Sequence, residues 1–199
     1  MISHRNLMLA SSGARPVEAA GWLYELQYGG IRVLAIRQGQ KTRLVSQRGR
    51  DLSACFPEII ASLDKLPNIV LDGELVILER GKPQAERLRR RARLKDEVSI
   101  RNASHWEPAA ILVSDILRLA KRDLRKRPLV ERREIARTAL HRAMGSFKRI
   151  RLVQQVANGN GLHEAAAGLG LQAVVAKRAD SRYRAGRSRD WVKIRTPRG

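Results

Sequence analysis

The stretch WLYELQYGGIRVLAIR, residues 22–37, decides the fold class of this chain. Its two apolar segments, 22–26 and 31–37, have the alternation that is typical of strands. The QYGG between them permits a tight reversal, because paired glycines accept left-handed backbone angles. TRLVS at 42–46 continues the same meander and ends in the turn sequence QRGRD. This part of the chain therefore predicts an antiparallel sheet.

The remainder of the chain interleaves helices with strands. Apolar spacings of three and four predict helices within 52–66 and 128–144. The spacing of Leu88 and the arginines predicts a short solvated helix within 80–95, and an Ala-rich stretch predicts a small helix near 161–168. Apolar runs predict strands at 68–79, 109–117, 150–153, 171–177 and 190–195. Helices and strands do not alternate with the regular period of a parallel sheet. We therefore expect an α+β fold of mostly antiparallel sheets flanked by helices, with residues 1–199 forming a single domain.

The charge of the chain is strongly one-sided. Forty Lys+Arg oppose 19 Asp+Glu in 199 residues, a formal net charge of +21, and only nine of the basic residues are lysines. Guanidinium groups match the geometry of phosphates well. GC-rich coding also inflates arginine, but a positive field of this strength attracts polyanions. We therefore expect contact with nucleic acid.

Three segments, 80–95, 118–137 and 178–198, carry much of the basic excess. Such runs are ordinarily solvated faces. The functional alternative is that at least two of them converge on one surface that follows a duplex backbone. On that alternative the candidate DNA contacts are Arg89, Arg90, Arg91, Arg182, Arg184 and Arg187.

Several kinds of protein are excluded by what the sequence lacks. Cys55 is the single cysteine, so neither an intramolecular disulfide nor a zinc cluster is expected, and the four histidines show no metal-ligand spacing. No apolar run approaches the roughly 20 residues that a membrane span needs. The N-terminal LMLA is too short for a signal peptide. We expect a cytoplasmic protein, free to associate with the nucleoid, and no membrane partner.

Three segments together resemble the adenylation domain of the ATP-dependent DNA ligase family, and within it the bacterial end-joining ligases. They are WLYELQYGGIRVLA at 22–35, VLDGELVIL at 70–78 and LQAVVAKRADSRYRAGRSRDWVKIR at 171–195. The similarity also takes in 46–59 and 114–134, and it covers nearly the whole chain in order. It implies a nucleotidyltransferase fold, ATP and Mg²⁺ as cofactors, and duplex, nicked or broken DNA and end-joining repair proteins as partners. The oligonucleotide-binding barrel that follows in such ligases is expected to be absent here.

The chemistry implied by the resemblance is nucleotidyl transfer through a lysyl-AMP phosphoramidate. Gln27 stands at the position of the nucleophilic lysine, and an amide nitrogen, whose lone pair is delocalised, cannot form that bond. Gly29 and Gln172 replace two carboxylates, and Ser114 replaces the aromatic residue that would stack on adenine. We therefore expect no catalytic residue at these degenerate positions, no self-adenylation and weak affinity for ATP.

Other positions retain the residue types of the family. The resemblance assigns nucleotide contacts to Glu25, Arg32, Glu74, Lys177 and Lys193. It also implies that Glu74 helps to bind the metal ion. Structural alternatives stay open for several of them. Glu74 with Asp72 could be a polar strand corner, Lys177 could be a solvated strand end, and Arg32 could pair with Glu74 or Glu25.

The leading hypothesis is a pseudo-ligase: a degenerate adenylation domain that binds DNA in repair, recombination or end joining without adenylating itself. One alternative is a partly active ligase domain that uses pre-adenylated DNA, because sealing does not require a lysine to attack ATP. Another is a decayed gene product without activity. RNA also stays open as a partner, because related nucleotidyltransferases act on RNA ends.

Overall fold

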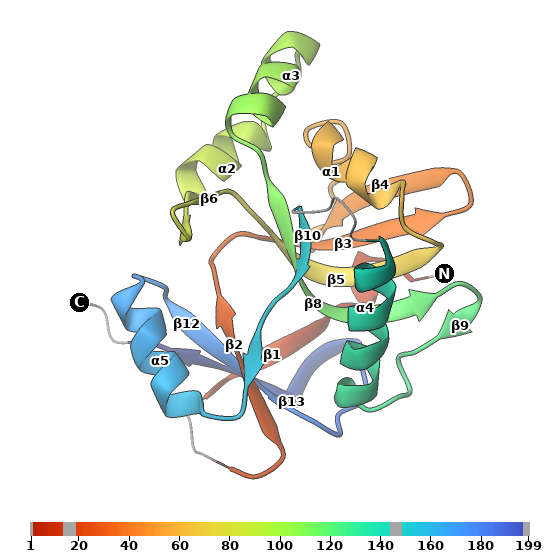
Figure 1. The fold of residues 1–199 in the computed structure, drawn as a ribbon. Helices are drawn as coiled ribbons and strands as arrows, with labels where there is room; N and C mark the ends of the chain where they lie inside the picture. The colour runs from red at the N-terminus through yellow and green to blue at the C-terminus, as the bar shows by residue number, and fades with distance from the viewer. Residues whose placement is uncertain (1, 14–18, 144–148, 197–199) are drawn as a thin grey trace.

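The computed structural model describes residues 2–13, 19–143 and 149–196, which form two main β-sheets with helices on their outer faces (Figure 1). The five-stranded sheet has the order β1 (Met8–Gly13), β13 (Gly186–Arg195), β12 (Ala173–Arg178), β2 (Trp22–Gln27) and β11 (Gln155–Val156). The larger sheet has the order β10 (Ile150–Leu152), β8 (Ala110–Leu119), β5 (Ile69–Val76), β3 (Ile31–Gln38) and β4 (Lys41–Ser46), with β9 (Arg122–Asp123) paired to β8. A two-stranded sheet joins β6 (Leu78–Glu79) to β7 (Lys82–Pro83).

Most strand pairs are antiparallel, and the parallel ones are β1 with β13 and β10 with β8. The helices are α1 (Pro57–Leu63), α2 (Ala85–Arg91), α3 (Glu97–Trp106), α4 (Leu129–Ala143) and α5 (Gly159–Gly168), preceded by a 3-10 turn at His4–Asn6. These elements confirm the predicted α+β class. The described residues contain no oligonucleotide-binding barrel.

The apolar core has separate parts that hold the two sheets in place. The largest part lies under the six-stranded sheet, where Phe56 and Leu140 pack with strand residues such as Leu71. Another lies between α5 and the five-stranded sheet. A third joins the two sheets, because Leu34 of one and Trp191 of the other belong to the same buried cluster. This junction between the sheets positions the site described below.

The predicted hairpin between 22–26 and 31–37 is wrong. β2 and β3 belong to different sheets, so residues 28–30 carry the chain from one sheet to the other. Close packing explains the crossing: a Cβ on Gly30 would lie 2.2 Å from the carbonyl oxygen of Leu75, so only glycine fits beside β5. The glycines that suggested a tight reversal therefore serve a sheet-to-sheet crossing.

Some predicted boundaries also differ. The helix expected within 52–66 is confined to α1, because the backbone N–H of Leu52 donates to Leu44 of β4 and holds the preceding segment against the sheet. Met144, the predicted end of α4, lies outside the described residues. In the part of the chain that the structure describes, no helix has the length and apolar character needed to cross a membrane.

Candidate functional site

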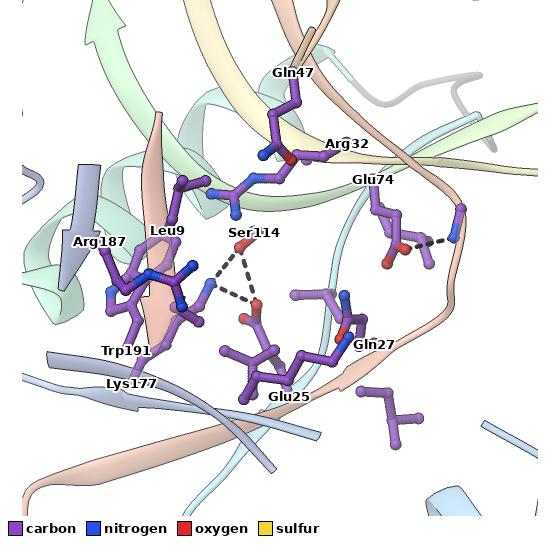
Figure 2. A pocket seen from close by; sticks show the side chains of 18 residues that line it. Leu9, Glu25, Gln27, Arg32, Gln47, Glu74, Ser114, Lys177, Arg187 and Trp191 are labelled. Atoms are coloured by element: carbon purple, nitrogen blue, oxygen red, sulfur yellow. Dashed lines mark hydrogen bonds and ion pairs between the residues drawn. The ribbon is translucent and has the colours of Figure 1, made fainter. Parts of the chain in front are cut away.

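A pocket of about 360 Å³ opens where the two sheets meet (Figure 2). Strands of both sheets line it, and every residue to which the sequence assigned a nucleotide contact is present. The lining residues that matter for the chemistry are Glu25, Gln27, Arg32, Glu74, Ser114, Lys177, Arg187, Trp191 and Lys193.

Strand register explains why distant residues meet on one wall. In β12, Val175 lies opposite Glu25 of β2 and opposite Lys193 of β13. Side chains two residues apart on a strand point to the same face, so Gln27 accompanies Glu25 and Lys177 accompanies Val175. The alternation visible in the sequence therefore places a carboxylate, an amide and two lysines in the pocket: Glu25, Gln27, Lys177 and Lys193.

A buried trio occupies one side of the pocket. Lys177 Nζ lies 2.5 Å from Glu25 Oε1 and donates to Ser114 Oγ, while Ser114 Oγ donates to the same carboxylate oxygen at 3.0 Å. The second oxygen of Glu25 accepts from Gln155 Nε2 at 2.9 Å, and the ring of Trp191 lies 3.9 Å from the lysine ammonium. Burial lowers the pKa of Lys177, and the Glu25 carboxylate opposes that shift. The alternative of a solvated strand end is therefore wrong, because Lys177 is 1% exposed.

Arg32 pairs with neither of the carboxylates that the sequence suggested. Its Nε and Nη2 donate to the two oxygens of Asp72 at 3.0 and 2.7 Å, and Nη2 also donates to the carbonyl of Met8. The hydroxyl of Tyr183 donates to the same carboxylate at 2.7 Å. Burial alone would lower the pKa of the Arg32 guanidinium, but the attraction of the Asp72 carboxylate is stronger, so the pKa of Arg32 is raised. Asp72 thus fixes Arg32 at the edge of the pocket.

Glu74 is engaged by the backbone of the crossing between the sheets. Its oxygens accept from the N–H groups of Tyr28 at 3.0 Å and Gly30 at 2.6 Å, on either side of Gly29, whose φ is +73°. Burial raises the pKa of Glu74, although both backbone N–H groups favour the charged form. The contact explains why Arg32, the cross-strand neighbour of Glu74, turns to Asp72 instead.

For the magnesium ion that the sequence resemblance implies, the pocket offers Glu74, which could hold the ion only together with other oxygen ligands such as phosphates and water. The oxygens of Glu74 already accept backbone N–H groups, and Gln172 is exposed and does not line the pocket. Gly29 lines only a neighbouring pocket. Within the described ranges no group of three or more His, Cys, Asp or Glu side chains is placed to hold a metal ion.

Gln27 occupies the pocket without a hydrogen-bond partner for its oxygen. Its Oε1 is buried and unpaired among the residues described. A buried amide oxygen without a partner is costly, so the amide is a polar group that a ligand could satisfy. The position assigned to a nucleophile therefore holds a neutral group able only to donate or accept hydrogen bonds.

Most of the candidate DNA contacts lie at the surface, and Arg91 does not. Arg89 and Arg90 of α2 are exposed, as are Arg182, Arg184 and Arg187. Arg91 is fully buried: its Nη1 lies 2.6 Å from Glu58 Oε1, and its guanidinium lies over the ring of Phe56, 4.6 Å from the centroid. Arg91 therefore cannot reach a DNA backbone.

The basic segment 118–137 is also partly internal. Arg132 is fully buried and pairs with Asp115 at 2.7 Å, while Arg133 donates to the carbonyls of Val113, Ser114 and Val153. In contrast, Arg48 and Arg50, for which the sequence predicted no role, line a second pocket with Arg89 and Gly29. The sequence feature that could have identified these two residues is the turn QRGRD, which places one arginine on each side of its glycine.

The fold and the pocket define a nucleotidyltransferase domain. A sequence profile described as "ATP dependent DNA ligase domain" matches residues 7–195, and the chain belongs to this family. It is 32% identical to DNA ligase C1 of Mycolicibacterium smegmatis over 94% of this chain and 55% of the relative. It is 30% identical to the multifunctional non-homologous end joining protein LigD of Mycobacterium bovis over 94% of this chain and 23% of that one. The chain thus spans about half the length of the first relative and less of the second.

Solved structures agree with this assignment. The ligase domain of LigD from M. tuberculosis has a TM-score of 0.76 at 28% identity, covering 94% of this chain and 58% of that one. A mycobacterial DNA ligase D complexed with ATP and MES has a TM-score of 0.73 at 27% identity, covering 96% and 60%. The family resemblance drawn from the sequence is therefore confirmed.

Proposed function

We propose that this chain is a single adenylation-type domain that binds DNA during repair or end joining and does not adenylate itself. It acts in the cytoplasm, at the nucleoid. The observation that carries the proposal is Gln27 lining the pocket at the position of the nucleophile, with an amide that cannot attack the α-phosphate of ATP. The lost carboxylates at Gly29 and Gln172 support the same conclusion.

The state of Glu25 supports weak recognition of adenine. Both of its oxygens are engaged within the protein, by Lys177 and Ser114 on one side and by Gln155 on the other. A serine hydroxyl offers no aromatic face to a base. A nucleotide would have to displace internal contacts and would gain no stacking in return.

Surface charge and the relatives support DNA as the partner. Arg89 and Arg90 on α2 and Arg182 and Arg184 before β13 are exposed cations, and cations of this kind neutralise backbone phosphates without reading sequence. The LigD relatives carry end joining in their names. Proteins that act with them in end joining are the partner class we propose.

The test is incubation with ATP labelled at the α-phosphate and magnesium, followed by denaturing electrophoresis. We expect no labelled band, while the ligase domain of a LigD relative run in parallel becomes labelled. A covalent band on this chain would overturn the proposal.

A second candidate is sealing of pre-adenylated nicked DNA. Lys193 favours it, because this lysine lines the pocket and no carboxylate pairs with it among the described residues. Sealing of a synthetic pre-adenylated nick without ATP would establish this activity. A decayed product would show neither sealing nor salt-dependent DNA binding.

A further inference from the structure

We propose that the pocket between the sheets is a phosphate site and not a purine site: it takes a terminal phosphate or a short phosphate chain, with no contribution from a base. This proposal names the ligand class of the same pocket. It rests on the proposed function in one respect, that the pocket does not become adenylated. The ligand chemistry has two sources, a free phosphate chain such as pyrophosphate and the 5′-phosphate of a DNA end.

The pocket has lost the two features that would select a base. Ser114 offers no ring for stacking, and Lys177, Ser114 and Gln155 together occupy the oxygens of Glu25. The Trp191 ring, the remaining aromatic surface nearby, faces the Lys177 ammonium 3.9 Å from its centroid. A cation already lies over that face, so the indole has no free face on this side for a base.

The cations of the pocket fall into two groups. Arg32 and Lys177 are neutralised, the first by Asp72 at 2.7 Å and the second by Glu25 at 2.5 Å. Arg187 and Lys193 also line the pocket, and neither has a carboxylate partner in the portion of the chain described. Two uncompensated cations in one pocket attract an anion.

Figure 2 shows how these groups are arranged around the opening. Arg187 and Lys177 lie on one side, Gln27 and Glu74 on the other, and Arg32 lies above Ser114. A phosphate is acceptor-rich and makes strong charge-assisted hydrogen bonds to guanidinium and ammonium groups. The amide nitrogen of Gln27 adds a neutral donor to this set.

Glu74 does not counteract this attraction as strongly as an ordinary carboxylate would. It accepts two backbone N–H groups, which spread its charge over the crossing at 28–30. Burial also raises its pKa, so its proton is held to higher pH than in an exposed glutamate. The charge balance of the pocket thus favours a ligand with several negative oxygens.

The experiment is calorimetric titration of the full chain with pyrophosphate, tripolyphosphate, AMP and adenosine, without a divalent metal. We expect the two phosphate chains to bind, adenosine not to bind, and AMP to bind no more tightly than pyrophosphate. Binding of adenosine, or AMP binding more tightly than both phosphate chains, would overturn the proposal.

Variants locate the binding. Arg187→Ala and Lys193→Gln should each weaken pyrophosphate binding by about tenfold, the effect of one charge-assisted hydrogen bond. Arg189→Ala is the matched control, because Arg189 is an exposed arginine of the same strand that does not line the pocket. Equal losses in the Arg187 and Arg189 variants would mean that bulk charge alone attracts the anion, which contradicts a site.

A competition experiment separates the two sources of phosphate. If DNA ends supply it, a duplex with 5′-phosphates displaces pyrophosphate and the same duplex with 5′-hydroxyls does not. If neither duplex competes, the free phosphate chain is the ligand. Pyrophosphate binding in the absence of any DNA binding would overturn the proposed function and leave the phosphate site standing. Salt-dependent DNA binding without pyrophosphate binding would do the reverse.

Discussion

Arg91 Nη1 lies 2.6 Å from Glu58 Oε1 inside the protein, whereas Arg89 and Arg90, its neighbours along α2, are exposed. The Arg91 guanidinium also donates to the carbonyls of Cys55 and Glu107. The ion pair therefore ties α2 to α1. In a run of three arginines, one supports the core and two remain available to a partner.

Replacing Arg91 by alanine should destabilise the protein strongly. The change leaves Glu58 buried without its cation, and breaking a buried pair in this way typically costs about 3–5 kcal/mol. Arg90→Ala, which breaks an exposed pair with Glu107, should change the free energy of unfolding by no more than about 1 kcal/mol. Urea denaturation of both variants measures the difference. Recovery of stability in the double variant Arg91→Leu with Glu58→Leu would confirm the charge as the cause, whereas equal losses in the two single variants would contradict it.

Duplex DNA should bind at micromolar concentration or tighter at low salt, without sequence preference. The log–log dependence of affinity on salt should have a slope of roughly −4 to −7, at about −0.9 per phosphate contact. Replacing Arg89 and Arg90 together by alanine should flatten the slope by about two units. Arg43→Ala is the control, since Arg43 is 56% exposed and ion-paired much as Arg89, at 54%, is. Fluorescence anisotropy between ~50 and ~200 mM salt measures both. A slope unchanged by the double replacement would remove α2 from the DNA surface.

Restoring the lost residues should return some self-adenylation if the scaffold is otherwise intact. The variant combines Gln27→Lys, Gly29→Asp, Gln172→Glu and Ser114→Phe. Gly29 has a φ of +73°, so the aspartate there is strained, and Gly29→Asn is the less strained alternative because asparagine tolerates such angles better. A labelled band with α-labelled ATP, absent when Gln27 is retained, is the expected result. A folded quadruple variant that stays unlabelled would mean that the pocket has changed beyond these four positions.

Glu74 should make stability fall as pH rises above the ordinary glutamate pKa of 4.5. Its pKa in the folded protein is raised above the ordinary value of 4.5, so the native state holds more protons than the unfolded chain above that pH. The free energy of unfolding therefore declines as pH increases from about 4.5 through the raised pKa. Glu74→Gln should remove this contribution, so its stability relative to wild type should improve with pH. Urea denaturation at several pH values tests this, with the exposed Glu86→Gln as control; a parallel pH profile for wild type and Glu74→Gln would contradict it.

The sequence predicted the strands well because their signal is local. Alternation and β-branched content depend only on neighbouring residues, so most strands appear close to their expected places. α3 was not predicted, because Ile100 is the one buried residue on that helix and leaves no apolar periodicity to detect. β1 was missed as well, since its stability comes from pairing with β13 at the other end of the chain.

Pairings within the site could not be predicted for a similar reason. Asp72 and Glu74 lie two residues apart on one face of β5, so the sequence alone allows either carboxylate to be the ion-pair partner of Arg32. The choice depends on the crossing at 28–30, whose N–H groups engage Glu74 and leave Asp72 for Arg32. The QYGG stretch was mistaken for a hairpin because glycine signals a permitted bend and not the sheet to which the next strand belongs.

The parallel pairing of β1 with β13 has a mechanical consequence. Met8 lies beside Gly186 and Gly13 beside Ile194, so the chain enters this pair at one end and leaves it at the other. Met8, at the start of β1, and Arg195, at the end of β13, therefore lie at opposite ends of the paired strands. Tension applied between them would slide the two strands past each other and load their hydrogen bonds together, instead of opening them one at a time. A domain of this construction resists stretching along the direction of these two strands.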